Sequence, residues 1–436
     1  MTATEQATSG TPAPAGHEAG HEEIITGCDA VAQALRLLDV DVLAGYPIRP
    51  YDSVMSAVSK MIANGQMDAE FIVAESEHSQ FEIGKHASLV GARAFIGSAG
   101  VGWMYGMEAL VVTASLRLPV IALVGNRALD DPGAFGVEHN DALMVRDTGW
   151  LLYWVESAQE ALDTTLLAYR VAEDKRVMLP CALSMDGAFL THSQHIVRVP
   201  DEERVSRFVP PYDLGDRRFH PDNPVSIAPQ FNEDWVMEAR RQSDAAMRRA
   251  RTVIGEATAD FQRLFGREPE DPFVDAYRME DAEYALIGMG TVGMVGKVAV
   301  DRMRAAGKKV GFVRVKWFRP FPRPELRALL RNVKGVGIVD RDYSFGSSSH
   351  AGVLYTEVTA ALYPEPRRPV VAPFIAGLGG REVSVENMLE MEDSVERVTA
   401  AGELDPTCQW IGVRGPATDP RYEQGENPRT AEGGAR

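Results

Sequence analysis

The 436-residue sequence predicts an α/β protein with two doubly wound parallel-sheet domains joined by a linker with a long helix. Short apolar runs rich in β-forming residues alternate with segments of helical periodicity in residues 23–200, and the alternation returns after residue 281. Between these regions, a proline-rich stretch precedes a long helical pattern. Alternating strands and helices favour parallel sheets that are covered on both faces.

The predicted organisation has five parts. Residues 1–22 are expected to form a disordered tail, and residues 391–436 a C-terminal extension that is disordered at its end. The first α/β domain is expected over residues 23–200, the linker arm and helix over 201–280, and the second α/β domain over 281–390. This agrees with domains of roughly 100–200 residues each.

Individual elements follow from the apolar spacing. In the first domain, strands are predicted at residues 41–46, 71–74, 94–96, 119–124 and 177–184. Helices are predicted between them at residues 30–38, 54–62, 79–89, 107–115 and 158–172. The linker helix is predicted at residues 233–265, and the second domain has predicted strands at 284–287, 310–315 and 335–339.

Composition excludes several classes of protein. The formal net charge of −17 argues against a nucleic-acid binder, which needs clustered Lys and Arg. An apolar run of ~18 residues and a signal peptide are both missing, so no membrane contact and a cytoplasmic location are expected. Cys28, Cys181 and Cys408 are too scattered to hold an iron–sulfur cluster or a disulfide framework.

Four loops that follow predicted strands carry the residues best suited to chemistry: residues 45–50, 75–78, 97–102 and 126–141. Ligands of open α/β sheets bind at the carboxyl ends of the strands, so these loops are expected to meet at one edge. Each loop alone has a structural explanation, such as a rigid diproline turn or a carboxylate at a helix start. Four such loops together favour a binding site.

Residues 288–293 (GMGTVG) follow a predicted strand and precede a helix, which is the spacing of a dinucleotide-binding turn. The next strand, at 310–315, leads into Lys316 and has no acidic residue at its end to bind a ribose. A glycine-rich turn also serves close packing. This motif therefore favours a packing turn over NAD binding.

The order of the motifs resembles the pyruvate:ferredoxin oxidoreductase superfamily. In the first domain, the resemblance is carried by residues 27–32 (GCDAVA), 46–50 (YPIRP), Glu77, 97–102 (GSAGVG) and 186–187 (DG). Residues 340–342 (DRD) and 377–381 (GLGGR) resemble the next domain of the superfamily. The resemblance implies a thiamine-diphosphate pyrimidine-binding domain followed by a transketolase C-terminal-like domain.

Thiamine diphosphate, shared with a partner subunit, is the cofactor that this resemblance implies. Enzymes with this cofactor hold a carboxyl group against N1′ of the aminopyrimidine ring, in an apolar pocket where it exchanges a proton near neutrality. Glu77 matches this carboxyl group, and Glu75 is the local alternative. The resemblance also implies cofactor contacts from Tyr46, Pro47, Ile48, Ser98, Gly100 and Gly102.

The superfamily's diphosphate and Mg²⁺ motif, GDG with a later Asn, is missing, because residues 185–187 are Met-Asp-Gly. The resemblance therefore implies that Mg²⁺ lies on a GDG-bearing partner subunit and that [4Fe-4S] clusters lie on a ferredoxin-like iron–sulfur subunit. A gamma-type subunit is a further expected partner. We expect no metal site in this chain and a complete active site only at a subunit interface. Either ferredoxin or NAD remains open as the final acceptor.

Arg49 stands where many family members have Thr beside the carboxylate of a small 2-oxoacid substrate, and Arg127 matches a second substrate arginine. Two arginines suit a substrate with two carboxylates, since each guanidinium group is a forked donor. The wider pattern is similar to the oxalate oxidoreductase branch, in which the residue at Phe135 lines the substrate pocket and the loop with Asp130 is thought to move. The implied catalytic residues are Glu77, Arg49, Arg127 and Asp130. The implied reaction converts oxalate to two CO2 and passes two electrons to the partner's clusters.

Two alternatives remain. An arylglyoxylate such as phenylglyoxylate has one carboxylate and a ring, and Trp103, Tyr105, Phe135 and Trp150 would then form an aromatic pocket rather than ordinary core. The chain is alternatively a non-catalytic scaffold subunit that keeps the fold, although retention of Glu77 and both arginines speaks against this.

Overall fold

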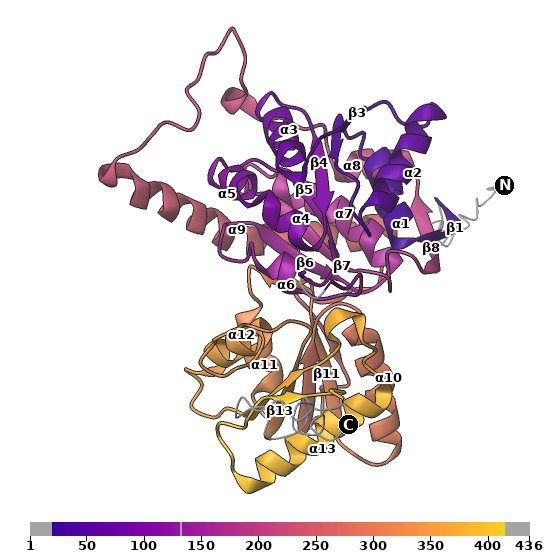
Figure 1. The fold of residues 1–436 in the computed structure, drawn as a ribbon, viewed down its shortest axis with the longest axis vertical. Helices are drawn as coiled ribbons and strands as arrows, with labels where there is room; N and C mark the ends of the chain where they lie inside the picture. The colour runs from indigo at the N-terminus through magenta and orange to yellow at the C-terminus, as the bar shows by residue number, and fades with distance from the viewer. Residues whose placement is uncertain (1–19, 131–132, 415–436) are drawn as a thin grey trace, which may run out of the picture.

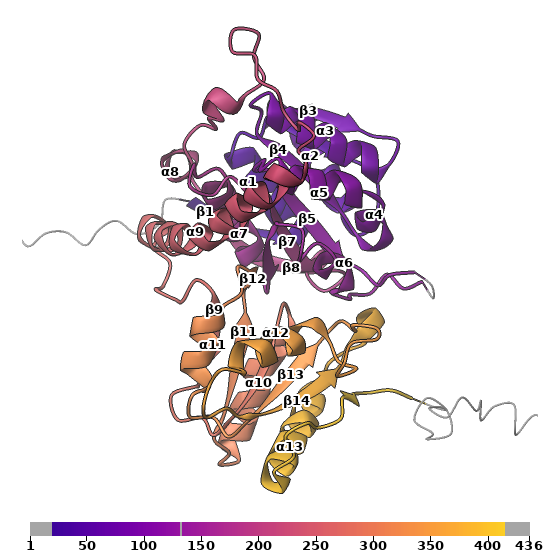
Figure 2. The ribbon, with the colours of Figure 1, turned by 90° about the vertical axis from the view of Figure 1, so that its left-hand side faces the viewer.

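The computed structural model describes residues 20–130 and 133–414, which form two α/β domains, one above the other in Figure 1. The predicted disordered ends therefore fall largely outside the described residues. Each domain is built around its own sheet, and the linker helix packs against the first domain (Figure 2).

The first domain contains a seven-stranded sheet in the order β12-β6-β7-β5-β4-β2-β3. Six neighbouring strands are parallel: β2 (Val42–Gly45), β3 (Glu70–Val73), β4 (Ala94–Ser98), β5 (Ile121–Asn126), β6 (Leu151–Val155) and β7 (Cys181–Asp186). The helices are α1 (Gly27–Leu37), α2 (Asp52–Ala63), α3 (Glu77–Leu89), α4 (Gly100–Tyr105), α5 (Met107–Ser115), α6 (Asn140–Leu143) and α7 (Ala158–Ala172). Every residue of β4 to β7 is buried, as expected for strands covered on both faces.

The second domain contains a six-stranded sheet in the order β15-β14-β13-β10-β11-β9. Its strands are β9 (Val274–Tyr277), β10 (Tyr284–Gly288), β11 (Val310–Val315), β13 (Gly335–Asp340), β14 (Val370–Ile375) and β15 (Gln409–Trp410). Its helical segments are α10 (Val292–Ala305), α11 (Arg323–Leu330), α12 (Val353–Leu362), η2 (Leu378–Gly380) and α13 (Val385–Ala401). All strand pairs are parallel except β9 with β11, so the predicted α/β class with parallel sheets is confirmed.

The linker forms α8 (Glu202–Phe208), η1 (Gly215–Arg217) and α9 (Glu233–Phe265), whose bounds equal the predicted helix at 233–265. The C-terminal half of α9 buries Ala250, Ile254 and Phe261 against the first domain. Its N-terminal end projects away from the body (Figure 1), whereas Ile227, in the segment before the helix, packs against the core of the first domain. The helix ends where Gly266 adopts the left-handed conformation, with φ 63°.

The boundaries of the domains differ from the predicted ones in three places. β1 (Gly20–Thr26) pairs antiparallel with β8 (Gln194–Pro200), so the last residues of the predicted tail belong to a strand. β9 lies within the predicted linker but pairs with β11. The predicted boundary at residue 390 lies inside α13, and β15 beyond it adds an edge strand to the second sheet.

One short strand joins the two domains. β12 (Trp317–Arg319) follows β11 of the second domain, yet it pairs antiparallel with β6 at the edge of the first sheet. Figure 2 shows β12 between the two domains. The buried ring of Trp317 packs edge-on against Tyr153, with 5.1 Å between ring centroids. The second domain thus completes the sheet of the first.

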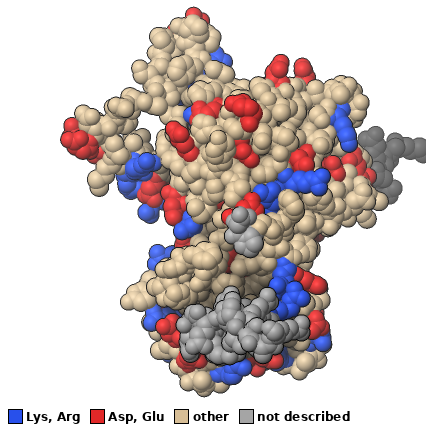
Figure 3. Space-filling model, in the orientation of Figure 1, with Lys and Arg blue, Asp and Glu red and all other residues tan. Residues whose placement is uncertain are grey.

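The surface and the helices also bear on function. Among the described residues, no helix combines the length and the apolar character that a membrane crossing requires. On the face shown in Figure 3, acidic and basic side chains are intermixed rather than collected into one basic surface.

Candidate functional site

Glu77 begins α3, directly after the loop that follows β3. Its side chain is buried, and its carboxylate has no hydrogen-bond or ion-pair partner within residues 20–130 and 133–414. Glu75, the alternative, is exposed and accepts a hydrogen bond of 2.5 Å from Ser79 Oγ, which holds the pKa of Glu75 below its ordinary value. Of the two, Glu77 is the enclosed carboxyl group whose oxygens are available to a ligand.

The predicted cofactor residues Ile48, Glu77, Ser98 and Gly102 meet in one place. A Cβ at Gly102 would overlap Glu77 Oε1 and would lie 2.6 Å from Ile48 Cδ1 and 2.8 Å from Ser98 Oγ. Ser98 Oγ is buried and unpaired in the part of the chain that the structure describes. A buried hydroxyl group is costly unless a ligand or water satisfies it, so this cradle suits a polar bound group.

The loop after β2 carries Tyr46, Pro47 and Arg49. Tyr46 is half-buried and Pro47 is exposed. The Arg49 side chain is 76% exposed and lies 3.7 Å from Asp52 Oδ2. This guanidinium group is therefore open to a ligand or to a partner chain.

Arg127 directly follows β5 and lies beside this loop. Its Nη1 donates a hydrogen bond of 3.2 Å to the Arg49 carbonyl oxygen, and its Nη2 lies 3.6 Å from Asp130 Oδ2. The guanidinium group stands 5.6 Å from the ring centroid of Phe135, which is largely exposed. Its Nε is buried and has no partner among the described residues. The structure thus places Arg127 beside the backbone of Arg49 and beside the side chains of Asp130 and Phe135.

Asp141, at the start of α6, joins the cofactor and substrate loops, although no role could be predicted for it from the sequence. Its Oδ2 accepts hydrogen bonds of 3.0 Å from the amides of both Gly100 and Arg127. Its Oδ1 accepts from Asn126 Nδ2 at 2.9 Å and from the Ala142 amide at 2.7 Å. Burial raises the pKa of this carboxyl, and the four hydrogen bonds oppose that rise.

A second buried carboxylate, Asp186 at the end of β7, connects the domains. It accepts hydrogen bonds from the Thr291 amide at 3.0 Å and from Arg341 Nη1 at 2.8 Å, both in the second domain. Its other oxygen lies 2.8 Å from His139 Nε2. Burial alone would raise the pKa of Asp186, but His139 and Arg341 hold it well below its ordinary value.

The GMGTVG turn is the place where Asp186 docks. A Cβ at Gly290 would lie 2.8 Å from Asp186 Oδ1, and one at Gly293 would lie 2.8 Å from Glu156 Oε1. Helix N-termini attract anions, and at α10 the first domain supplies that anion. The turn therefore packs against Asp186 where a dinucleotide-binding turn would hold a pyrophosphate, which argues against an NAD site.

The second domain also holds the backbone of the substrate loop. The His139 amide donates to the Arg341 carbonyl oxygen at 2.9 Å, and the Gly380 amide donates to the Val137 carbonyl oxygen at 3.0 Å. Glu138 Oε1 accepts from the Gly379 amide at 2.9 Å. The DRD and GLGGR motifs thus contact the loop after β5, and a cavity of about 700 Å³ lies between that loop and the second domain.

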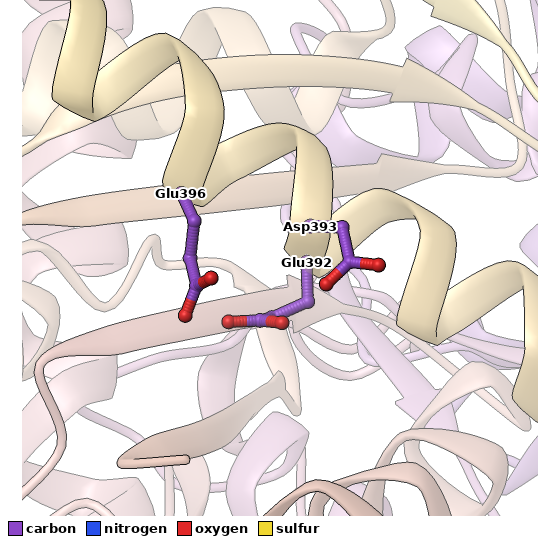
Figure 4. Close-up of side chains that lie close together, drawn as sticks. All are labelled: Glu392, Asp393 and Glu396. Carbon is purple, nitrogen blue, oxygen red and sulfur yellow. The ribbon is translucent and has the colours of Figure 1, made fainter.

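A cluster of carboxylates lies far from these loops. Glu392, Asp393 and Glu396 extend from α13 close to one another (Figure 4). Lys308 Nζ donates hydrogen bonds to all three, at 2.6 Å to Asp393 and 3.2 Å to Glu396. The lysine ammonium group already occupies the place of a cation, so this cluster is an ion-pair network.

The geometry agrees with comparisons to known proteins. Residues 33–259 match the family described as pyruvate flavodoxin/ferredoxin oxidoreductase, thiamine diphosphate-binding. Residues 282–388 match pyruvate:ferredoxin oxidoreductase core domain II.

Curated relatives match along nearly their whole length. The pyruvate synthase subunit PorA of Methanocaldococcus jannaschii is 35% identical over 392 residues, which cover 90% of this chain and 98% of the relative. The PorA subunit of Pyrococcus horikoshii is 38% identical, with coverage of 88% and 96%. The ketoisovalerate oxidoreductase subunit VorA of Pyrococcus abyssi is 35% identical, with coverage of 90% and 98%.

Solved structures share the fold. The 2-oxoglutarate:ferredoxin oxidoreductase from Magnetococcus marinus matches with a TM-score of 0.63 and 18% identity. The match covers 87% of this chain and 65% of that one, so this chain spans slightly under two thirds of its length. A split-gene transketolase matches with a TM-score of 0.50 and 13% identity over 86% of this chain and 99% of that one.

The chain therefore belongs to the pyruvate flavodoxin/ferredoxin oxidoreductase family, whose thiamine diphosphate-binding domain it contains. Within that family it is the alpha subunit of a 2-oxoacid:ferredoxin oxidoreductase, and so a component of an oxidoreductase.

Proposed function

We propose that this alpha subunit belongs to an oxalate oxidoreductase, which converts oxalate to two CO2 and passes two low-potential electrons to [4Fe-4S] clusters on a partner subunit. The observation that carries the proposal is that two arginines lie on neighbouring loops of the thiamine diphosphate domain, since Arg127 Nη1 donates a hydrogen bond to the backbone carbonyl of Arg49 and the Arg49 side chain is open. Each carboxylate of a small dianion then has its own guanidinium partner.

Glu77 is the proposed aminopyrimidine carboxyl group. Its enclosed and unpaired oxygens, the adjacent unpaired hydroxyl of Ser98 and the space left by Gly102 all fit a bound aminopyrimidine ring. When bound, thiamine diphosphate supplies the carbon nucleophile that attacks the substrate. Glu77 exchanges the proton at N1′ that makes this nucleophile available.

Arg127 and Arg49 are the proposed substrate-binding residues. Arg127 is nearly buried, and among the described residues the carboxylate that pairs with its guanidinium group is Asp130, which is 3.6 Å away and partly exposed. A buried cation with incomplete pairing is stabilised by an anionic ligand. Arg49, whose side chain is open, binds the second carboxylate. Phe135 and Asp130 border this place, and Asp130 exchanges with the substrate as the counter-ion of Arg127.

Pyruvate is a second candidate substrate, favoured by the PorA relatives. Phenylglyoxylate has less support, since two of the four aromatic residues considered for its pocket are core. Trp103 and Trp150 are fully buried and pack edge-on, with 5.8 Å between their ring centroids. Only Tyr105 and Phe135 of that set are exposed.

Partner subunits complete the proposed site. Val101 and Tyr105 flank Gly102 on α4 and are both exposed, so an apolar surface borders the Glu77 cradle. We propose that a GDG-bearing subunit covers this surface and supplies the diphosphate and Mg²⁺ contacts. A ferredoxin-like iron–sulfur subunit and a gamma-type subunit are the other proposed partners.

Assays of the purified complex with oxalate, pyruvate and phenylglyoxylate test the proposal. We expect turnover of oxalate, and we expect Arg49→Thr to lower kcat/KM for oxalate roughly 10- to 100-fold, because a charged hydrogen bond is lost. Glu77→Gln is expected to lower turnover of every substrate by roughly 100-fold or more. A wild-type complex that oxidises pyruvate and not oxalate would end the oxalate proposal. Full activity of Glu77→Gln would instead support a scaffold subunit.

A further inference from the structure

We propose that Asp141 is a positioning residue that holds the cofactor loop and the substrate arginine in register with each other. The inference rests on the roles proposed for Gly100, Arg127 and Glu77. One oxygen, Asp141 Oδ2, accepts hydrogen bonds of equal length, 3.0 Å, from the amides of Gly100 and Arg127. The two loops that must bind cofactor and substrate together are therefore tied to a single atom.

The position of Gly100 bears directly on the site. Gly100 is the first residue of α4, and Gly102, two residues further on, packs against Glu77. With φ at 51°, Gly100 lies so close to Arg127 that a Cβ there would be 3.0 Å from Arg127 Nε. A shift of either loop would therefore change the spacing between the Glu77 cradle and the Arg127 guanidinium group.

Local helix capping does not account for this arrangement. Asp141 lies within α6, which has only four residues, and only the Ala142 amide belongs to that helix. The other three donors belong to Gly100, Asn126 and Arg127, which lie 14 to 41 residues away in the chain. The carboxylate is fully buried, so water does not replace these bonds.

The chemistry of the site requires a carboxylate rather than an amide. Four N–H donors converge on the two oxygens of Asp141, and a carboxylate is a side chain with acceptors alone. An asparagine must turn its NH2 group toward two of the four donors in either orientation. Exchanging the two side chains, with Asp at position 126 and Asn at position 141, can compensate for this loss. An aspartate at position 126 can still accept the hydrogen bond of 2.7 Å that Ser184 Oγ now donates to Asn126 Oδ1.

The test compares three variants in the assembled complex: Asp141→Asn, the exchange Asn126→Asp/Asp141→Asn, and the control Asp147→Asn. In the exchange variant, the new amide donates to the new carboxylate and keeps its oxygen toward Gly100 and Arg127. The Ala142 amide loses its acceptor, so the exchange is expected to restore the two constants but not the full melting temperature. Asp147 lies in the same segment, and its side chain is 73% exposed. The measurements are the thiamine diphosphate dissociation constant by calorimetry, KM and kcat, and the melting temperature.

We expect Asp141→Asn to raise both the thiamine diphosphate dissociation constant and KM by roughly tenfold or more, because buried donors lose their acceptor. The exchange variant should recover both constants to within about threefold of wild type, and Asp147→Asn should match wild type. A purely structural role would lower the melting temperature and leave both constants unchanged in the assembled variant, which would overturn the inference.

The test remains decisive if a variant fails to assemble or if the oxalate proposal fails. If Asp141→Asn does not assemble, Asn126→Asp alone takes its place, because it sets a second carboxylate against Asp141 Oδ1. Constants about tenfold weaker in that variant, restored by the exchange, support the inference, and wild-type constants in it overturn the inference. The kinetic assay uses whichever 2-oxoacid the wild-type complex oxidises. Failure of the oxalate proposal would therefore leave this test intact, and the calorimetric constant needs no turnover.

Discussion

Gly102 lacks a side chain at the point where the Glu77 carboxylate lies. Its position is bordered by Glu77, Ile48 and Ser98, and it has no positive φ that would by itself require glycine. The missing side chain therefore lets the Glu77 carboxylate lie against the backbone of α4. A methyl group there would compete directly with the carboxylate for the same volume.

We predict that Gly102→Ala weakens thiamine diphosphate binding by roughly tenfold, since overpacking of this kind typically costs about 1–3 kcal/mol and Glu77 must move. Calorimetric titration of the assembled complex measures this change. Gly255→Ala is the matched control, because no atom lies within 4 Å of a Cβ built at that position in α9. The control should leave cofactor binding unchanged and add roughly 0.5–1 kcal/mol of stability. Wild-type cofactor affinity in Gly102→Ala would contradict the prediction.

Side chains that act through their own chemistry could be predicted from the sequence. Glu77 and Arg127 each follow a strand and carry a group with an evident use in catalysis or binding. Asp141 could not be predicted in the same way, because its partners include the backbone amides of Gly100 and Arg127. Every residue but proline has such an amide, so only the folded positions of the loops reveal the contact.

Among the elements, the short strand β12 joins the two domains although it has only three residues. Its three residues extend the first sheet from the second domain, and the buried Trp317 fills the gap beside Tyr153. Without it, β6 would be an edge strand with unpaired backbone groups.

We predict that Trp317→Ala lowers the free energy of unfolding by roughly 3–5 kcal/mol, the usual cost of removing a buried tryptophan. Denaturant titration followed by circular dichroism measures the loss. Trp235→Ala, at an α9 position that is 62% exposed, should change stability by no more than about 0.5 kcal/mol. Equal losses in the two variants would show that β12 does not hold the domains together.

Length decides which elements the sequence reveals. α9 spans 33 residues with an apolar face and a glycine after its end, so its bounds could be predicted. β12 has three residues and no periodicity, and it pairs with a strand more than 160 residues earlier. β6 was not predicted either, although β5 and β7, which are equally buried, were predicted from their apolar runs.

At the scale of the whole molecule, Asp186 forms a buried ion pair that joins the two domains. It is a buried carboxylate of the first domain that pairs with Arg341 of the second. Its depressed pKa means that folding stabilises the ionised form. That stabilisation is fully present above the unfolded pKa, which is about 3.9, and is lost as the pH falls below it.

We predict that Arg341→Met lowers the free energy of unfolding by roughly 3–5 kcal/mol at pH 7, because Asp186 loses a buried partner. The difference in the free energy of unfolding between wild type and variant should shrink as the pH falls below about 4, because the unfolded chain then protonates Asp186 while the folded wild type still holds it ionised. Denaturant titrations across this pH range measure this difference. Arg302→Met, which removes an exposed pair with Glu386, should cost no more than about 1 kcal/mol. A difference in the free energy of unfolding that stays constant down to pH 3 would contradict the role of the Asp186–Arg341 ion pair.

The order of the motifs along the chain was enough to predict the α/β class and the family, since each motif lies at a strand end. The contacts between domains could not be predicted. The GMGTVG turn shows why: its glycines are visible in the sequence, but the anion that they hold comes from Asp186, about 100 residues earlier and in another domain.

The shared strand β12 also bears on how the complex assembles. Because β12 ties the second domain to the sheet of the first, the two domains should tumble as one body, and scattering from the free chain should fit a single fixed arrangement of the described residues. A partner then docks on a platform whose domain angle is already set. Binding of the partner then causes no further loss of interdomain conformational entropy. A larger share of the free energy of the contacts therefore contributes to affinity.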